Sequence, residues 1–249
     1  MGLVAENLST GYGDRVVTGG IDLALAPGRL TVLIGANGSG KSTLLRTLTG
    51  SQPALGGSVE LDGKPVGEYS PAALARKLSL VLTDRTGGGG LTVTELVGIG
   101  RHPYSGFLGR MGAEDKRLVA EAIESVGLGH KKDCFVASLS DGERQKAMIA
   151  RAIAQSTDIV VLDEPTSFLD VSSRFEIMDL LSRMSRGGTT VLLSTHDIAP
   201  ALAVADRVWA LGKGRVYDGT VDELSASGAL DTIYPGVVFD SVSGDFRRR

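Results

Sequence analysis

Residues 35–43 read Gly-Ala-Asn-Gly-Ser-Gly-Lys-Ser-Thr, and this stretch constrains the fold more than any other part of the chain. An apolar stretch at residues 30–34 precedes it and a helix-forming stretch at residues 44–48 follows it, which is the strand–loop–helix context of a phosphate-binding loop. The glycines let successive backbone N–H groups point at one anion, and the start of the helix adds the positive end of its dipole. We expect Lys41 to reach the β and γ phosphates of a nucleotide and the Ser42 hydroxyl to bind Mg²⁺. A connection that binds no ligand would not need Lys and Ser directly after its last glycine.

The pattern of apolar residues predicts an α/β fold around this loop. Residues 159–162 are all apolar, as in parallel strands buried on both faces, and residues 189–193 predict a second buried strand. Alternating residues before position 26 and a hairpin at Asp62-Gly63 predict an antiparallel sheet beside this core. Two capping boxes, at residues 92–95 and 140–143, and an amphipathic stretch at residues 113–126 predict a helical insertion.

Two acids and a histidine follow the predicted buried strands. Asp163 and Glu164 come directly after residues 159–162, and His196 comes shortly after residues 189–193. Open α/β sheets bind their ligands at the carboxyl ends of their strands. If residues 159–162 pair with the strand that enters the phosphate loop, Asp163 can hold Mg²⁺ through water, and Glu164 can act as general base for an attacking water. His196 could polarise that water or the γ phosphate; the alternatives are two solvated acids in a turn and a structural histidine.

Composition excludes several other classes of protein. The chain has 249 residues, a formal net charge of -3 and one cysteine, Cys134, so it can form neither an internal disulfide nor a cysteine-based metal site, and nucleic acid is not a favoured partner. The apolar stretches are far shorter than the ~20 residues that cross a bilayer, and residues 1–9 lack a secretory pattern. We therefore expect a soluble protein whose membrane role comes through a partner. The basic residues 247–249 are expected to be a frayed, solvated end, with contact to anionic lipid as the alternative.

Taken in order, these motifs resemble those of the ATP-binding subunits of ABC transporters, and the resemblance covers nearly the whole chain. The segments that carry it are similar to Walker A (residues 35–43), the ABC signature Leu-Ser-Asp-Gly-Glu (139–143), Walker B (159–164), the D-loop (167–170) and the switch histidine (His196). The signature separates this family from kinases, GTPases and helicases, which share the phosphate loop.

The resemblance implies a fold class and a division of the chain. The fold is an α/β P-loop ATPase core with a parallel sheet, an antiparallel β subdomain and an inserted α-helical subdomain. Within a single ATP-binding domain over residues 1–249, the core and antiparallel subdomain would comprise residues 1–83 and 156–225. Residues 84–155 would form the helical subdomain and residues 226–249 a C-terminal tail.

The resemblance also implies a site that binds ATP and Mg²⁺. Catalytic roles would belong to Glu164, His196 and Lys41, and metal ligation to Ser42 and Asp163; Asp84 is a further metal ligand by our own hypothesis, given below. The implied nucleotide-binding residues are Tyr12, Gly35, Asn37, Gly38, Ser39, Gly40, Lys41, Ser42, Thr43, Ser140, Gly142 and Glu143. Tyr12 stands where the family has an aromatic residue that stacks on adenine; local packing in a hairpin is the alternative. Each ATP would lie between Walker A of one copy and the signature of a second, head-to-tail copy, with Ser140 and the Gly142 backbone donating to the γ phosphate.

Two places depart from the family pattern. Thr83 and Asp84 stand where the Q-loop glutamine is expected, and we hypothesise that one of them replaces its contact with Mg²⁺. Asp141 and Glu143 stand where Gly and Gln are commoner, although Glu143 still completes a capping box.

Residues 91–104 are similar to a segment found in importers of ferric siderophores, haem and vitamin B12. This resemblance implies the ATP-hydrolysing subunit of an ABC importer, a translocase that drives uptake of a metal chelate, with a ferric siderophore favoured. Its partners would be a second ATPase copy, transmembrane permease subunits and, indirectly, a substrate-binding protein, at the cytoplasmic face of the cell membrane. The alternatives are an ABC ATPase for another cargo, a soluble ABC ATPase in cofactor assembly or nucleic-acid processing, and a nucleotide-dependent regulator. Intact Glu164 and His196 argue against the regulator.

Overall fold

The computed structural model describes residues 2–82, 90–105, 110–212, 214–241 and 243–249. A six-stranded sheet forms its middle, and its strands are β3 (Leu30–Gly35), β6 (Leu78–Val81), β7 (Ile159–Asp163), β8 (Thr190–Ser194), β9 (Arg207–Gly212) and β10 (Arg215–Gly219). The strand order is β10-β9-β3-β8-β7-β6, and every neighbouring pair is parallel except β9 and β10. The expected parallel core is therefore confirmed.

Both faces of this sheet are buried, because successive side chains of a strand point to opposite faces. In β3, Val32 and Ile34 belong to a core cluster that extends through the helices, whereas Leu33 belongs to a second cluster. The second cluster includes the apolar side chains of α1 (Lys41–Leu48). The loop between β3 and α1 thus starts from a strand that is packed on both sides.

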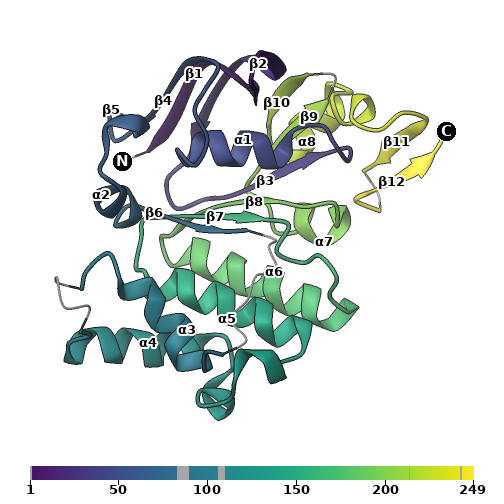
Figure 1. The fold of residues 1–249 in the computed structure, drawn as a ribbon. Helices are drawn as coiled ribbons and strands as arrows, with labels where there is room; N and C mark the ends of the chain where they lie inside the picture. The colour runs from purple at the N-terminus through teal and green to yellow at the C-terminus, as the bar shows by residue number, and fades with distance from the viewer. Residues whose placement is uncertain (1, 83–89, 106–109, 213, 242) are drawn as a thin grey trace.

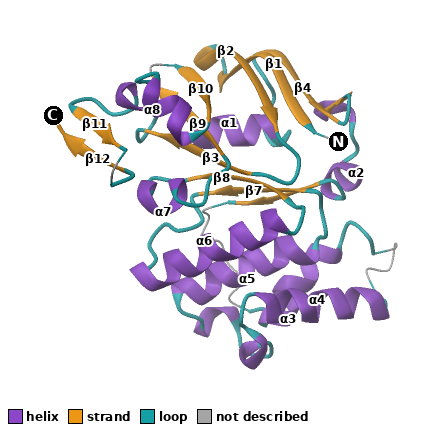
Figure 2. Cartoon of the chain, turned by 180° about the vertical axis from the view of Figure 1, so that it is seen from behind, coloured by secondary structure: helices purple, strands orange, loops and turns teal. Residues whose placement is uncertain are grey.

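An antiparallel sheet covers the α1 side of the molecule. Its strands, in the order β2-β1-β4-β5, are β1 (Leu3–Tyr12), β2 (Arg15–Leu25), β4 (Gly56–Leu61) and β5 (Lys64–Pro65). Helix α1 lies between the two sheets (Figures 1 and 2). The predicted turn at Asp62-Gly63 is confirmed, with φ of 55° and 74°. After β5, the chain forms a 3₁₀ helix at Val66–Glu68.

Helices cover the other face of the central sheet (Figure 1). The α-helices after α1 are α2 (Pro71–Ala75), α3 (Val93–Gly98), α4 (Ala113–Ser125), α5 (Asp141–Ala154), α6 (Val171–Arg186), α7 (Ile198–Leu202) and α8 (Val221–Ala226). Short 3₁₀ helices occupy Ile99–Arg101, Gly129–Lys131, Val136–Ser138 and Leu230–Thr232. Both predicted capping boxes, at Thr92 and Ser140, are present. Within the described residues, no helix has the length and apolar character that crossing a membrane requires.

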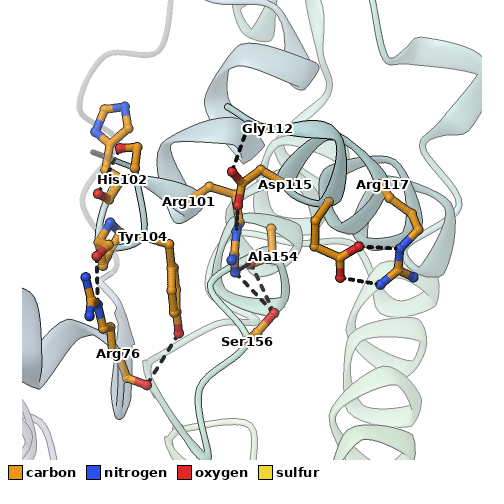
Figure 3. Close-up of polar contacts among 12 residues, drawn as sticks. Arg76, Arg101, His102, Tyr104, Gly112, Asp115, Arg117, Ala154 and Ser156 are labelled. Carbon is orange, nitrogen blue, oxygen red and sulfur yellow. Dashed lines mark hydrogen bonds and ion pairs between the residues drawn. The ribbon is translucent and has the colours of Figure 1, made fainter. Parts of the chain in front are cut away.

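A buried arginine joins two helices of the helical layer, beside a contact of this layer with the core (Figure 3). Arg101 donates from Nε to Asp115 of α4 over 2.9 Å and from Nη1 to the last carbonyl of α5 over 2.8 Å. The ring of Tyr104 lies 3.9 Å from the Arg101 guanidinium. On the core side, Arg76 follows α2 and donates from Nε to the Pro103 carbonyl over 2.8 Å. The end of the segment that resembles metal-chelate importers therefore contacts α4, α5 and the residue that follows α2.

The C-terminal residues form a hairpin of β11 (Val237–Asp240) and β12 (Asp245–Arg248). The expectation that residues 247–249 are a frayed end is wrong. Arg247 and Arg248 pair with β11, and the Arg249 N–H donates to the Gly236 carbonyl over 3.3 Å. Phe239 and Phe246 anchor this hairpin, because both pack against the main core cluster.

Candidate nucleotide site

The phosphate loop runs from the end of β3 to the start of α1 and needs glycine at particular points. Gly38 and Gly40 have φ of 74° and 105°, in the left-handed region that other residues rarely adopt. A Cβ on Gly40 would lie 2.6 Å from Val17, and a Cβ on Gly35 would lie 2.8 Å from the Leu211 carbonyl oxygen. These contacts keep the loop close against β2 and β9.

A cavity of about 370 Å³ opens above this loop. It is lined by Tyr12, Arg15, Val17, Asn37, Gly38, Gly40, Lys41, Ser42, Thr43 and Glu164. Tyr12 is exposed, and its hydroxyl accepts a hydrogen bond from Thr43 Oγ1 over 3.1 Å. Arg15 and Val17 were not predicted as site residues; the signal for them was their place on the strand that returns after the turn at Gly13-Asp14.

Lys41 is buried at the floor of the site. Its Nζ donates to the carbonyls of Gly35 over 2.9 Å and Ala36 over 3.3 Å, and lies 4.0 Å from Glu164 Oε1. Burial lowers the pKa of Lys41, while the carboxylates of Glu164 and Asp163 oppose this shift. Within the chain, this ammonium group has two carbonyl acceptors and a carboxylate at 4.0 Å as partners. A phosphate would add negative charge and further acceptor oxygens.

Ser39 tests whether the loop fits a phosphate. Its Oγ is buried and has no hydrogen-bond partner among the described residues. A buried hydroxyl without a partner costs free energy, so each such group calls for an explanation, and a ligand is one where the group lies in a binding loop. A phosphate oxygen in the loop is a suitable acceptor, and the loop therefore fits a nucleotide.

Glu164 comes directly after β7 and has a left-handed backbone, with φ of 49°. Its N–H donates to the Ser194 carbonyl over 3.1 Å, which fixes this bend against β8. Its Oε2 accepts from Ser167 Oγ over 2.9 Å and lies 3.3 Å from Nδ1 of the exposed His196. Backbone strain of about 1–3 kcal/mol is common at functional sites, where it sets the direction of a side chain. The structure thus brings Glu164, His196 and Lys41 together, as the sequence predicted.

The strand order that brings these residues together differs from the one considered from the sequence. β7 does not pair with β3, because β8 lies between them. Asp163 and Glu164 still reach the site, since parallel strands end at one edge of the sheet. Asp163 is buried and accepts from Ser194 Oγ over 2.6 Å. This contact of Ser194 was not predicted, although Ser194 ends the neighbouring strand.

For a divalent metal, the described residues provide hard oxygen donors at this edge, among them those of Ser42 and Asp163. Ser42 lines the cavity, and Asp163 ends β7. Among the described residues, no three His, Cys, Asp or Glu side chains gather as a metal cluster. A hydroxyl and a carboxylate are the donor types that Mg²⁺ takes when phosphates and water complete its shell. Thr83 and Asp84, the predicted Q-loop replacement, lie outside the described residues.

Comparison with known proteins identifies the family. The sequence profile described as ABC transporter matches residues 18–167, which is more than half of the chain. The chain belongs to the ABC transporter family. It is an ATP-binding protein of this family, whose members hydrolyse ATP to drive transport.

Relatives of this ABC protein cover most of its length. The iron(3+)-hydroxamate import ATP-binding protein FhuC of Bacillus subtilis is 36% identical, over 93% of this chain and 87% of the relative. The ferric enterobactin transport ATP-binding protein FepC of Escherichia coli is 37% identical, over 93% of this chain and 86% of the relative. A solved dimeric structure of a bacterial ABC transporter cassette matches with a TM-score of 0.76 and 26% identity, over 88% of this chain and 98% of that one. The fold class expected from the sequence is confirmed.

The residues that resemble the ABC signature lie away from this cavity, at the start of α5. Ser140 Oγ accepts from the Glu143 N–H over 3.3 Å, and the Glu143 carboxylate accepts from the Ser140 N–H over 3.0 Å. Lys131 Nζ also donates to Glu143 over 2.6 Å. These contacts, the one with Lys131 first, lower the pKa of Glu143 from its ordinary 4.5 to about 2. A Cβ on Gly142 would lie 2.8 Å from Ser173 Oγ, so this glycine lets α5 start close against α6.

Proposed function

We propose that this chain is the ATP-hydrolysing subunit of an importer whose cargo is a metal chelate of the ferric siderophore class. The observation that carries hydrolysis is the Glu164 carboxylate, held at the end of β7 with Lys41, Ser167 and His196 around it. The cargo class is supported by FhuC and FepC, which are named for iron(3+)-hydroxamate import and ferric enterobactin transport.

In this proposal, Glu164 is the general base that takes a proton from the attacking water. Ser167 donates to Oε2, which leaves Oε1 on the side of Lys41 and the phosphate loop. The left-handed backbone of Glu164 aims the carboxylate at this position. His196 lies next to Oε2 and is exposed, so it is placed to orient the water or donate to the γ phosphate.

The phosphate loop would hold the nucleotide. Lys41 contacts the β and γ phosphates, and the backbone N–H groups between Gly35 and Thr43 surround them together with Ser39 Oγ. Tyr12 provides a ring for the adenine at the mouth of the cavity. Ser42 and Asp163 would hold Mg²⁺, which would neutralise phosphate charge when bound.

A second copy would complete the site. Ser140, Gly142 and Glu143 do not line the cavity of their own chain among the described residues. The exposed N-terminus of α5 is a suitable donor group for a γ phosphate held by a partner copy. The dimeric cassette of similar fold supports such a pair.

A groove of about 420 Å³ is the site that we assign to the permease. Leu74, Leu78 and Leu80 of the core line it, together with Gln155 at the end of the helical layer. Gln155 Nε2 donates to the carbonyls of Ala75 over 2.6 Å and Leu78 over 3.2 Å. A segment of the permease inserted in this groove would contact both the core and the helical layer. A movement of the helical layer against the core would therefore be transmitted to the permease.

Replacing Glu164 by Gln tests the hydrolysis step. We expect ATP turnover by purified protein to fall by about 10²–10⁴-fold, because the amide cannot accept the proton, with ATP affinity retained. Glu6→Gln, at an exposed position on β1, serves as the control and should keep wild-type turnover. Equal turnover of Glu164→Gln and wild type would remove the base assignment.

Uptake measurements test the cargo. A strain that lacks this chain should lose uptake of radioactive iron supplied as ferric hydroxamate or ferric catecholate, and the wild-type chain, but not Glu164→Gln, should restore it. Haem, vitamin B12 and a maltose-type sugar serve as comparison cargos. Affinity isolation from native membranes should recover a permease. Isolation of a soluble assembly or nucleic-acid complex instead would favour the alternative ABC ATPases.

A further inference from the structure

Three large apolar side chains are exposed in the turn after β7 and at the start of α6. Phe168, Val171 and Phe175 are 70%, 67% and 55% exposed. Val171 and Phe175 are four positions apart in α6, so they lie on the same side of this helix. The described residues include eight exposed large apolar side chains, and three of them lie within residues 168–175. We call Phe168, Val171 and Phe175 the α6 patch, because such a concentration of exposed apolar side chains marks an interaction surface.

The backbone of the α6 patch is held by its neighbours in the chain. Phe168 has φ of 65°, in the left-handed region that aromatic residues rarely adopt. The next residue, Leu169, is buried in the main core cluster. Asp170 Oδ1 accepts from the Ser173 N–H over 2.9 Å at the start of α6. A strained backbone persists only where its surroundings fix it, so the exposed ring of Phe168 is carried by a fixed segment.

One side of the α6 patch adjoins the nucleotide cavity. Ser167, which precedes Phe168, donates from Oγ to Glu164 Oε2 over 2.9 Å. Glu164 lines the cavity. The first residue of the patch therefore follows directly on a residue that contacts the carboxylate proposed as the base.

The other side of the α6 patch adjoins the residues that resemble the ABC signature. A Cβ on Gly142 would lie 2.8 Å from Oγ of Ser173, which belongs to the first turn of α6. Lys146 of α5 forms an ion pair with Glu176 of α6. Figures 1 and 2 show these two helices side by side beneath the central sheet. The α6 patch therefore lies between the two halves of the proposed ATP site.

Twofold symmetry determines what this position faces in a pair of copies. Each copy would give its signature to the phosphate loop of the other, and the axis that exchanges these two contacts passes between the phosphate loop and the signature of each copy. The surface between them therefore faces the same surface of the second copy. Its three side chains carry no charge, so they can meet their own counterparts without like-charge repulsion.

We propose that the α6 patch is an apolar contact between two copies of this chain, in which the patch of one copy packs against the patch of the other. The proposal rests on the pairing of two copies stated above. The contact joins the copies directly, in addition to the ATP that each phosphate loop would share with the partner's signature. Burial of the exposed rings on both sides of the axis would stabilise the pair.

Phe175→Gln tests this contact, because it removes the apolar ring, adds no charge and keeps a good helix former. The substitution is made in Glu164→Gln, which would hold ATP without turnover, and sedimentation with ATP and Mg²⁺ measures the Kd of the dimer. We expect this Kd to rise by about tenfold or more, since the change occurs twice at one interface. The Kd for ATP of the separate copies should be unchanged.

Val4→Gln is the matched control, because Val4 is an exposed apolar residue of β1 in the antiparallel sheet. It should leave the Kd of the dimer unchanged. If Phe175→Gln also leaves this Kd unchanged, the proposal is wrong, and loss of a co-isolated permease instead would assign the α6 patch to the permease. If Glu164→Gln itself does not dimerise with ATP, the proposed pairing fails and this contact fails with it.

Cross-linking tests the position of the α6 patch directly. Cys134 is the only cysteine, so Cys134→Ser gives a background without thiols. In that background and with Glu164→Gln, Phe175→Cys should give cross-linked dimers with a short bismaleimide in the presence of ATP. Val4→Cys should stay monomeric under the same conditions. Dimerisation with ATP without cross-linking of Phe175→Cys would place the two patches apart and contradict the proposal.

Discussion

At the scale of single residues, the nucleotide site contains a buried polar group that has no hydrogen-bond partner among the described residues. Ser39 Oγ is buried in the phosphate loop without a partner among the described residues. Thr31 Oγ1, near the start of β3, is also buried without one, but it lies among core side chains. Both hydroxyls lack a hydrogen-bond partner, but only that of Ser39 lies in the phosphate loop. Thr31 can therefore serve as a control for Ser39.

Ser39→Ala is expected to raise the Kd for ATP about threefold to tenfold, because a phosphate oxygen loses one donor. Without nucleotide, its free energy of unfolding should be at least that of wild type, since a buried hydroxyl without a partner is removed and no contact inside the protein is lost. Titration with ATP and urea unfolding measure the two quantities. Thr31→Val removes the other hydroxyl and should leave the Kd unchanged. An unaltered Kd for Ser39→Ala would mean that the hydroxyl does not face the ligand.

The residues of the site were predictable where the chemistry is local in the sequence. Lys41 and Ser42 directly follow the last glycine of the loop, so their direction is set by the start of α1. The hydrogen bond from Ser167 to Glu164 was not predicted, because it depends on the left-handed backbone at Glu164. The residue type of a glutamate does not predict a positive φ.

At the scale of elements, the capped helices were predictable and the strand order was not. A capping box joins residues three apart, so the starts of α3 and α5 could be located from sequence alone. The position of β8 between β3 and β7 depends on pairing between distant segments. The C-terminal hairpin was missed for a similar reason, since its short strands β11 and β12 are stabilised by aromatic packing with Tyr234.

The capping box of α5 leads to a prediction about pH. The folded-state pKa of Glu143 is about 2, below its ordinary 4.5, so the ionised carboxylate stabilises the folded chain. This contribution is complete above about pH 4.5 and is lost as the pH falls from 4.5 toward 2. Glu143→Gln should therefore be less stable than wild type by about 1 kcal/mol at pH 7, and the difference should shrink at pH 4 and pH 3.

Urea unfolding at each pH measures this difference. Lys131→Met is the control, because it removes the partner of the ion pair while keeping the Glu143 carboxylate at the cap. The double variant should show that the two losses are not additive, as expected for residues in contact. A difference between wild type and Glu143→Gln that stays constant from pH 7 to pH 3 would contradict the lowered pKa.

At the scale of the whole molecule, the two halves of the proposed site lie on different parts of the chain. The cavity above the phosphate loop is lined by residues of this loop, of the antiparallel sheet and of the central sheet's edge, and the capped start of α5 belongs to the helical layer. A pair of copies related by twofold symmetry would place the start of α5 of each copy over the phosphate loop of the other. Two variants that damage different halves should then complement each other.

Lys41→Ala disables the phosphate loop, and Ser140→Asp keeps a good N-cap while placing a negative charge where a γ phosphate would bind. Each variant alone should have little ATPase activity. When the two variants are mixed in equal amounts, half of the randomly formed dimers contain one copy of each. Each mixed dimer has one intact site of two, so about a quarter of wild-type turnover should return. In the control, the double variant Lys41→Ala/Ser140→Asp replaces Ser140→Asp and should restore nothing. If native mass spectrometry shows mixed dimers and turnover stays at the level of the separate variants, the signature of one copy does not complete the site of the other.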